Sequence, residues 1–180
     1  MIINLPFLLF YFILKPISRP DVLFASFSQC YSLIPGQVGA YFRRNFYRFT
    51  MMSCGKDVVI GFGTLFSHAD IEIGDNVYIG PQGNIGLCKI EEDCLLGSGV
   101  HILSGKKQHN FKDLTQPLRM QGGSYEKVTL GNNVWVGNCA IVMANVGERS
   151  VVGAGAVVGA PVERLSIMAG NPAVFVSQVK

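Results

Sequence analysis

The chain has 180 residues, of which 49% are hydrophobic and only 15% are charged, and its formal net charge at pH 7 is +3. This length predicts one domain with a terminal extension, and the apolar content is ample for a hydrophobic core. Residues 1–56 hold six basic residues against one acidic residue, and the remainder holds nine against eleven. Because the positive charge is confined to one segment with no recognisable nucleic-acid-binding module, nucleic acid is not an expected partner.

The N-terminal segment is apolar but short. Residues 1–14 are almost wholly apolar, whereas a membrane-spanning helix needs about 20 such residues. No basic residue precedes this run and no small-x-small cleavage site clearly follows it, so it does not resemble a secretory signal. Pro16 and Pro20 are expected to break any helix, and a second apolar stretch, residues 22–34, ends at Pro35.

Residues 41–49 interleave aromatic residues with arginines. This pattern suits a membrane interface, where rings lie at headgroup level and guanidinium groups meet anionic lipid. The alternative is a helical cap on the end of the core, with its arginines in solvent. We favour membrane contact through residues 1–50, which would place the protein peripherally on the inner face of the cytoplasmic membrane. The five cysteines form no CxxC pair, which fits a reduced, cytoplasmic setting, and Cys94 is expected to be a small core residue.

Aliphatic residues recur every six positions between residues 73 and 158, and glycine usually follows each one. A period of six keeps such residues on one face of a strand, whereas a helix would scatter them. The position four residues after each aliphatic is small, as a narrow, close-packed prism requires. Glycine fits a corner that needs a positive φ or a close backbone approach. The small inward residues are Val77, Gly83, Val100, Val134, Ala140, Ser150 and Ala156.

The pattern predicts an all-β solenoid whose coils each contain three short strands joined by sharp corners. We expect it to occupy residues 57–160, after an N-terminal helical extension of residues 1–56, and to be closed by residues 161–180. The spacing slips by one or two residues at three corners, among them the five-residue step from Ile85 to Ile90, and residues 103–127 carry no hexapeptide signal. Long excursions from a rigid scaffold are usually functional or disordered.

The hexapeptides, above all IGDNVYIGP and LGNNVWVGN, resemble those of the left-handed parallel β-helix acyltransferases. The tail MAGNPA likewise resembles the GNPA motif that closes many of them. The resemblance implies a left-handed helix, a hand that the residues alone do not predict, because parallel crossovers are generally right-handed. It also implies a likeness to sugar O-acetyltransferases, with acetyl-CoA as the acyl donor, no metal, and a homotrimer with clefts between its subunits.

A histidine in the long loop is the candidate general base. Acyl transfer from a thioester to a hydroxyl needs a base for the hydroxyl proton, and an imidazole, with a pKa near ~6.5, suits neutral pH. His109 lies in the loop at residues 103–127, where the resemblance places the catalytic histidine; a solvated loop residue is the alternative. His101 should point outward, either flanking the cleft or solvated, and His68 should lie at the surface. Neither a GxSxG elbow nor a GxxxxGK[ST] loop is present, which favours direct transfer over an acyl-enzyme.

Two further residues are candidates for the acceptor site. Trp135, the only tryptophan, precedes the inward Val136 and should therefore point outward, where a neighbouring subunit or a ligand would cover it. Asn84 resembles a residue that helps to hold the acceptor sugar in related enzymes, and His101 is grouped with it.

For coenzyme A, the resemblance implies contacts with the backbone near Asn138, Ala154 and Gly159, where small side chains permit close approach. The family commonly has Arg or Lys after the GNPA motif to meet the phosphates, but this chain has a valine there. Arg164 or Lys180 would have to take that role.

These features predict a coenzyme A-dependent O-acyltransferase, with acetyl as the expected group, acting on a saccharide or lipid-linked glycan in polysaccharide biosynthesis. One alternative is a γ-class carbonic anhydrase, which resembles the same prism and binds zinc through three histidines across a subunit interface. That class has two histidines five residues apart, whereas His101 and His109 are eight apart. The other alternative is a non-catalytic scaffold.

Overall fold

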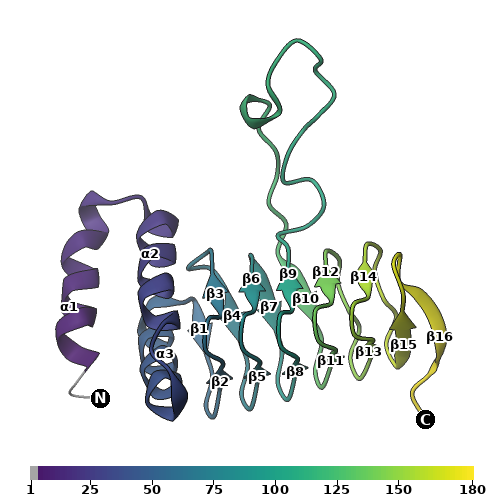
Figure 1. The fold of residues 1–180 in the computed structure, drawn as a ribbon, viewed down its shortest axis with the longest axis horizontal. Coiled ribbons are helices and arrows are strands. Elements are labelled where there is room, and N and C mark those ends of the chain that lie inside the picture. The colour runs from purple at the N-terminus through teal and green to yellow at the C-terminus, as the bar shows by residue number, and fades with distance from the viewer. Residues whose placement is uncertain (1–3) are drawn as a thin grey trace.

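The computed structural model describes residues 4–180 as a helical cap followed by a β-solenoid (Figure 1). The cap contains α1 (Leu5–Leu14), the short 3-10 helix η2 (Lys15–Ile17), α2 (Pro20–Ser32) and α3 (Gly36–Thr50). The chain leaves α1 at Pro16 and begins α2 at Pro20, so the prolines break the helices where the sequence predicted. No helix within residues 4–180 has both the length and the apolar character that a bilayer crossing would need.

The solenoid has three walls, and we name them A, B and C. Wall A consists of β1 (Ser53–Cys54), β4 (Glu72–Ile73), β7 (Cys88–Ile90) and β10 (Val128–Leu130), continued by parallel bridges from Leu130 to Val146 and from Val146 to Val162. Wall B consists of β2 (Val59–Ile60), β5 (Tyr78–Ile79), β8 (Leu95–Leu96), β11 (Trp135–Val136), β13 (Val151–Val152), β15 (Ser166–Ala169) and β16 (Val174–Gln178). Wall C consists of β3 (Leu65–Phe66), β6 (Asn84–Ile85), β9 (His101–Ile102), β12 (Ile141–Val142) and β14 (Val157–Val158).

Neighbouring strands of each wall are parallel, except that β16 runs antiparallel to β15. The second residue of most strands points inward and stacks on the equivalent residue of the next coil. On wall B, for example, Ile79 lies in register with Leu96, which lies in register with Val136, and all three are fully buried. The predicted parallel β-helix is therefore confirmed, and Cys94 is a buried core residue as expected.

The glycines that follow the inward residues are explained by close approach of the backbone rather than by a positive φ. A Cβ at Gly137 would lie 2.5 Å from the backbone nitrogen of Ala154 in the next coil, too near for any real side chain. The left-handed φ values fall instead at other corner residues, among them Asn76 (58°) and Asn133 (55°). Asparagine tolerates this conformation better than most residues do.

The solenoid extends beyond the predicted range of residues 57–160 at both ends. It begins at β1, where Cys54 and Gly55 occupy the positions of an aliphatic residue and its glycine. The sequence pattern missed this strand because cysteine is not an aliphatic residue. At the other end β15 adds a further strand to wall B, and β16 folds back to cover it.

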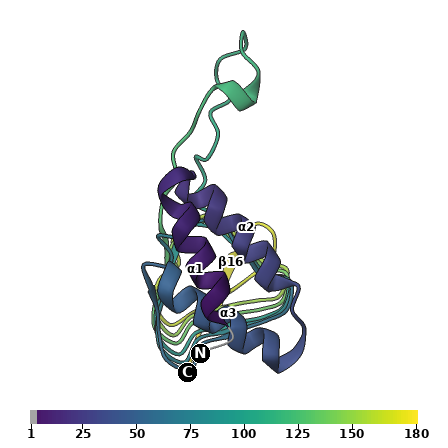
Figure 2. The ribbon, with the colours of Figure 1, turned by 90° about the vertical axis from the view of Figure 1, so that its left-hand side faces the viewer.

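The cap covers the open end of the first coil, where strand edges would otherwise be left without partners. α3 contacts β1 and β2, and α2 contacts β3. The hydroxyl of Ser28 on α2 accepts a hydrogen bond from the backbone N–H of Phe66 (2.9 Å). The guanidinium of Arg43 on α3 donates to the carbonyl oxygen of Ile60 (2.9 Å). Figure 2, which looks onto this end, shows the helices lying across the triangular section of the solenoid.

The aromatic and arginine-rich segment, residues 41–49, is therefore part of the cap, and the expectation that it faces lipid is wrong for its inward residues, whereas Tyr41 and Phe49 are exposed. Arg43 is 1% exposed, and Phe46 and Tyr47 are fully buried among the aromatic rings of α1, α2 and β3. The alternative, a cap with solvated arginines, is wrong about Arg43 as well. Its guanidinium is held by three backbone carbonyl groups.

Candidate active site

The long loop leaves the solenoid between β9 and β10, at the edge where wall C turns into wall A (Figure 1). Its base is fixed by Ser104, which is buried. The hydroxyl of Ser104 accepts a hydrogen bond from the N–H of Leu87 (2.8 Å), and its carbonyl accepts one from the N–H of Glu126 (2.9 Å).

The loop has a stalk of two antiparallel legs and a head, residues 111–120. The N–H of Ser124 donates to the carbonyl of Lys107 (2.8 Å), and the N–H of Asn110 donates to that of Gly122 (2.9 Å). Gly123 makes this close pairing possible, because a Cβ there would overlap the backbone of Gln108 on the other leg. The two legs of the stalk are therefore joined by backbone contacts.

Internal hydrogen bonds hold the head together. The side-chain oxygen of Gln121 accepts from the N–H of Asp113 (3.1 Å), and its side-chain nitrogen donates to the carbonyls of Asp113 (2.7 Å) and Gln116 (3.0 Å). Four apolar side chains of the head are nevertheless exposed: Phe111, Leu114, Leu118 and Met120. Leu114 is 97% exposed, so the head presents an apolar surface to whatever lies beside it.

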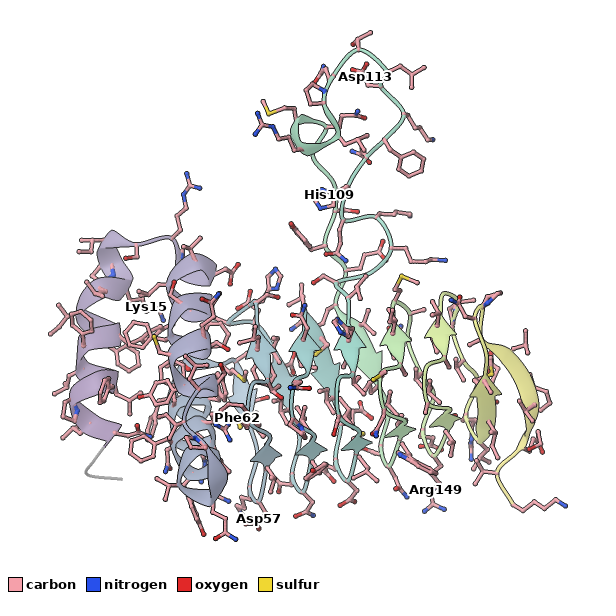
Figure 3. The ribbon with its side chains drawn as sticks, viewed as in Figure 1. Lys15, Asp57, Phe62, His109, Asp113 and Arg149 are labelled. Atoms are coloured by element: carbon pink, nitrogen blue, oxygen red, sulfur yellow. The ribbon has the colours of Figure 1, made fainter. Side chains whose placement is uncertain are left out.

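His109 lies in the stalk, just before the head, and Figure 3 shows it outside the solenoid. Its ring is exposed. The next residue, Asn110, is fixed by its backbone bond to Gly122 and by a side-chain bond to the carbonyl of Gln121 (3.1 Å). The backbone next to His109 is thus anchored while the imidazole stays accessible to solvent and to ligands.

Wall C brings together two residues that are 17 positions apart in the sequence. Asn84 and His101 lie opposite each other in the parallel pairing of β6 and β9, and both side chains point outward. Parallel strands lie about 4.8 Å apart, so an amide and an imidazole stand side by side on this wall. The five-residue spacing from Ile85 to Ile90 falls at the following corner and leaves this pairing intact.

His68 is the histidine that the sequence interpretation undervalued. It lies at the same edge as the loop, just after β3, and its ring is half-buried. Its Nδ1 lies 2.8 Å from the hydroxyl of Ser67, and its ring centroid lies 5.4 Å from that of Tyr125 at the foot of the loop. No repeat signal marks this residue, because it belongs to a corner.

Trp135 points outward, which confirms the register predicted for it, and it is 51% exposed. It belongs to wall B, whereas Asn84 and His101 belong to wall C. Trp135 is one of a row of outward apolar residues that pair strand by strand along wall B: Val59, Tyr78, Leu95, Trp135, Val151 and Ile167. The structure therefore does not bring Trp135 and the wall C pair onto one face of the single chain.

The residues predicted for coenzyme A are spread over the solenoid. Asn138 and Ala154 lie one coil apart on the edge between walls B and C, where the Asn138 side chain accepts a hydrogen bond from the N–H of Ser98 (3.0 Å). Gly159 lies on the edge between walls C and A, the edge that carries the loop. Arg164 lies 3.3 Å from a carboxylate oxygen of Glu148 on the third edge. Lys180 is the last residue and is exposed.

Two lysines at the foot of the loop lie beside carboxylates. Lys127 donates to Glu72 on wall A (2.7 Å), and Lys107 lies 3.9 Å from Glu126 across the stalk. Burial raises the pKa of the Cys88 thiol to about 12 and that of Cys94 to about 11, so neither provides a thiolate at neutral pH. Within residues 4–180, no three His, Cys, Asp or Glu side chains are grouped as a metal ion would require.

No family model matches the sequence. Curated relatives do: the chain is 29% identical over 122 residues to a probable macrolide acetyltransferase of Lysinibacillus sphaericus, covering 59% of this chain and 62% of that protein. It is 33% identical over 112 residues to a putative acetyltransferase of Schizosaccharomyces pombe (61% and 44%). It is 28% identical over 129 residues to the galactoside O-acetyltransferase of Escherichia coli (69% and 53%). The chain thus spans between 44% and 62% of the length of these relatives.

Solved structures show the same fold. A galactoside acetyltransferase in complex with coenzyme A superposes with a TM-score of 0.74 at 21% identity, covering 89% of this chain and 81% of that one. A maltose O-acetyltransferase from Clostridium difficile gives 0.73 at 21% (91% and 90%). A hexapeptide-repeat acetyltransferase from Vibrio cholerae, complexed with acetyl-CoA, gives 0.72 at 19% (87% and 85%). In both sequence and fold, the chain resembles the hexapeptide-repeat acetyltransferases, as its repeats and its GNPA tail predicted.

Proposed function

We propose that the protein is a coenzyme A-dependent O-acetyltransferase that acts on a hydroxyl of a saccharide or a lipid-linked glycan, as in polysaccharide biosynthesis. The observation that carries this proposal is the exposed imidazole of His109, on a hydrogen-bonded stalk that rises from a solenoid of the hexapeptide-repeat acetyltransferase type. The similarity to galactoside and maltose O-acetyltransferases supports a sugar acceptor, and their complexes with coenzyme A or acetyl-CoA support the donor.

In the proposed reaction, His109 removes the proton of the acceptor hydroxyl as the oxygen attacks the thioester carbonyl of acetyl-CoA. The carbon–sulfur bond then breaks, coenzyme A leaves as its thiolate, and that sulfur takes up the proton that His109 received from the hydroxyl. The acetyl group passes directly to the acceptor, so no acyl-enzyme forms. The Asn84 and His101 side chains, adjacent on wall C, would hydrogen-bond the acceptor.

The proposed site is completed by a second copy of the chain. The exposed Trp135 lies on wall B, whereas His101 lies on wall C and His109 on the loop beyond it. One chain therefore supplies the two sides of a cleft but not the cleft itself. Placing wall B of one copy against wall C and the loop of the next is a heterologous contact, which closes into a ring when the rotation allows, and a triangular prism suits a ring of three.

Coenzyme A would lie along such a cleft, beside the small residues of the solenoid edges, including Asn138, Ala154 and Gly159. Arg164 is the stronger candidate for its phosphates, because its side chain is 68% exposed and only one carboxylate competes for it. Lys180, which is also exposed, is the other candidate.

The experiment measures acetyl transfer by the His109→Ala variant, with galactosides and maltose as acceptors. Release of the coenzyme A thiol is the readout. We expect turnover to fall by about 10²–10⁴-fold, the usual contribution of a general base. Lys56→Ala, an exposed residue away from the loop, is the control and should keep its activity. Circular dichroism and light scattering check that the fold and the oligomer are unchanged.

Undiminished turnover in His109→Ala would remove the proposed base. Failure of the parent protein to bind acetyl-CoA by calorimetry would remove the proposed activity and favour the non-catalytic scaffold.

A further inference from the structure

The solvent-facing side of α1 carries only apolar side chains, which is unusual for a helix in contact with water. Leu8 and Tyr11 form a buried seam, and Asn4, which precedes the helix, is also buried. Every remaining side chain of the helix is apolar, and most are exposed: Leu5, Phe7, Leu9, Phe10, Phe12 and Ile13, followed by Ile17 at 80% exposure. A surface helix of a soluble protein normally carries polar residues on its outer face. Contiguous exposed apolar surface of this kind marks a contact site.

α1 is also the outermost layer of the molecule. It packs on α2 and also on α3, where the Tyr11 ring centroid lies 5.5 Å from that of Phe46. Figure 1 shows α1 at the end of the long axis opposite to β16. α2 and α3 make the main contacts with the first coil, and α1 covers their outer side through Tyr11. Packing within the cap therefore explains the buried seam of α1 but not its apolar outer face.

An apolar pocket opens between α1 and the helices behind it. It has a volume of about 420 Å³, and its lining is largely aromatic: Phe7, Phe10, Ser26, Phe27, Cys30, Tyr31, Ile34 and Phe42. None of these side chains is charged. A pocket of this composition suits hydrocarbon rather than a sugar or a nucleotide.

Basic residues flank the apolar surface. Lys15 is the first residue after α1, Arg19 follows η2, and both are exposed. The Lys15 ammonium lies 5.9 Å from the centroid of the Phe12 ring, so its aliphatic stem runs along the apolar face while the charge is at its rim. The single acid of residues 1–56, Asp21, accepts a hydrogen bond from the N–H of Ala69 (3.1 Å).

We infer that α1, η2 and the pocket behind them bind the surface of a bilayer that contains anionic lipid. The helix lies in the interface, the pocket admits an acyl chain, and Lys15 and Arg19 meet the headgroups. A helix of this length measures about 15 Å, half of the ~30 Å hydrocarbon core, so it lies on the membrane rather than crossing it. A second copy of the chain is the weaker occupant, because its α1 surface offers no acidic partner to these cations.

This inference narrows the membrane contact expected through residues 1–50 to residues 5–19, and it is independent of the proposed transferase activity. Figure 1 shows α1 running across the end of the solenoid, roughly perpendicular to its long axis. A bilayer that contacts α1 along its length would therefore leave the solenoid projecting away from the surface.

The test is flotation of the full chain with vesicles made of equal parts phosphatidylglycerol and phosphatidylcholine, compared with vesicles of phosphatidylcholine alone. The double variant Ile13→Glu/Ile17→Glu removes two exposed apolar side chains and should weaken binding by about 10²-fold. The matched control is Val174→Glu/Val176→Glu on β16, whose parent residues are similarly exposed (60% and 59%) at the other end of the molecule. The control should bind vesicles as the parent does.

Lys15→Glu and Arg19→Glu should each weaken binding to the anionic vesicles by roughly fivefold and leave binding to phosphatidylcholine unchanged. Circular dichroism and the melting temperature establish that each variant is folded. Absence of flotation by the parent protein, or equal flotation of the α1 variant and the β16 control, would overturn the inference. Loss of an oligomer in Ile13→Glu/Ile17→Glu, without vesicle binding by the parent, would assign the surface to a second copy instead.

Discussion

Replacement of Arg43 by methionine tests the structure of the cap, because this buried cation is held by carbonyl groups alone. Its guanidinium donates to the carbonyl oxygens of Ile60 (2.9 Å), Tyr31 (3.1 Å) and Ile34 (2.7 Å). No carboxylate within residues 4–180 forms an ion pair with it. Burial lowers the pKa of Arg43, but an arginine keeps its proton in proteins. The Arg43 side chain therefore joins the end of α2 to β2, the first strand of wall B.

The size of the effect follows from these three bonds. Methionine fills a similar length without donors, so the buried carbonyl of Ile60 is left without the donor that Arg43 provides, at about 1–3 kcal/mol. The carbonyl of Tyr31 keeps a hydrogen bond from the N–H of Ile34 (3.3 Å), and the bond to the Ile34 carbonyl is only partly buried, so these two losses are smaller. Part of the total is offset, because the guanidinium is no longer desolvated in the folded state. We expect a net loss of about 2–3 kcal/mol in the free energy of unfolding. With a urea m-value of about 2 kcal/mol per M, the unfolding midpoint should fall by about 1–1.5 M.

The assay is urea unfolding followed by far-ultraviolet circular dichroism. Arg48→Met is the matched control, because Arg48 lies on the same helix but is exposed, and its replacement should change stability by no more than about 0.5 kcal/mol. Equal midpoints for the two variants would show that Arg43 is not a buried link, and the cap described here would be refuted.

Two further predictions concern the loop and the cysteines. Gly123→Ala should force the two legs of the stalk apart and speed cleavage of the loop by proteases, with little change in the melting temperature. Gly122→Asn is the control and should not speed cleavage, because a Cβ at this position would meet no atom within 4 Å. Mass spectrometry of the fragments compares the two variants, and equal cleavage rates would contradict the close packing at Gly123. In the folded protein at pH 8, Cys88 and Cys94 should resist alkylation by iodoacetamide while the exposed Cys30 reacts, because burial raises the pKa of the first two thiols to about 12 and about 11 and leaves almost no thiolate. All three should react in urea, and rapid modification of Cys88 in the folded state would contradict its burial.

The hexapeptide period was enough to predict the solenoid, the outward direction of Trp135 and the point at which the loop leaves. Each coil contacts only its neighbours, so a local repeat determines which side chains face the core. The same reasoning missed β1, because Cys54 stands where the repeat usually has an aliphatic residue. It also left His68 at the surface, because a corner residue carries no period.

The amino-acid sequence by itself therefore determined the repeating part of this protein: the coil, its buried faces and the small residues that let the prism close. Only the tertiary structure decided that Arg43 is enclosed by carbonyl groups, that Asn84 and His101 stand side by side, and that α1 keeps an apolar outer face. The physical reason is the range of the contacts. A repeat is specified by spacing along the chain, whereas a cap and a site depend on groups that the completed coils bring together from distant positions.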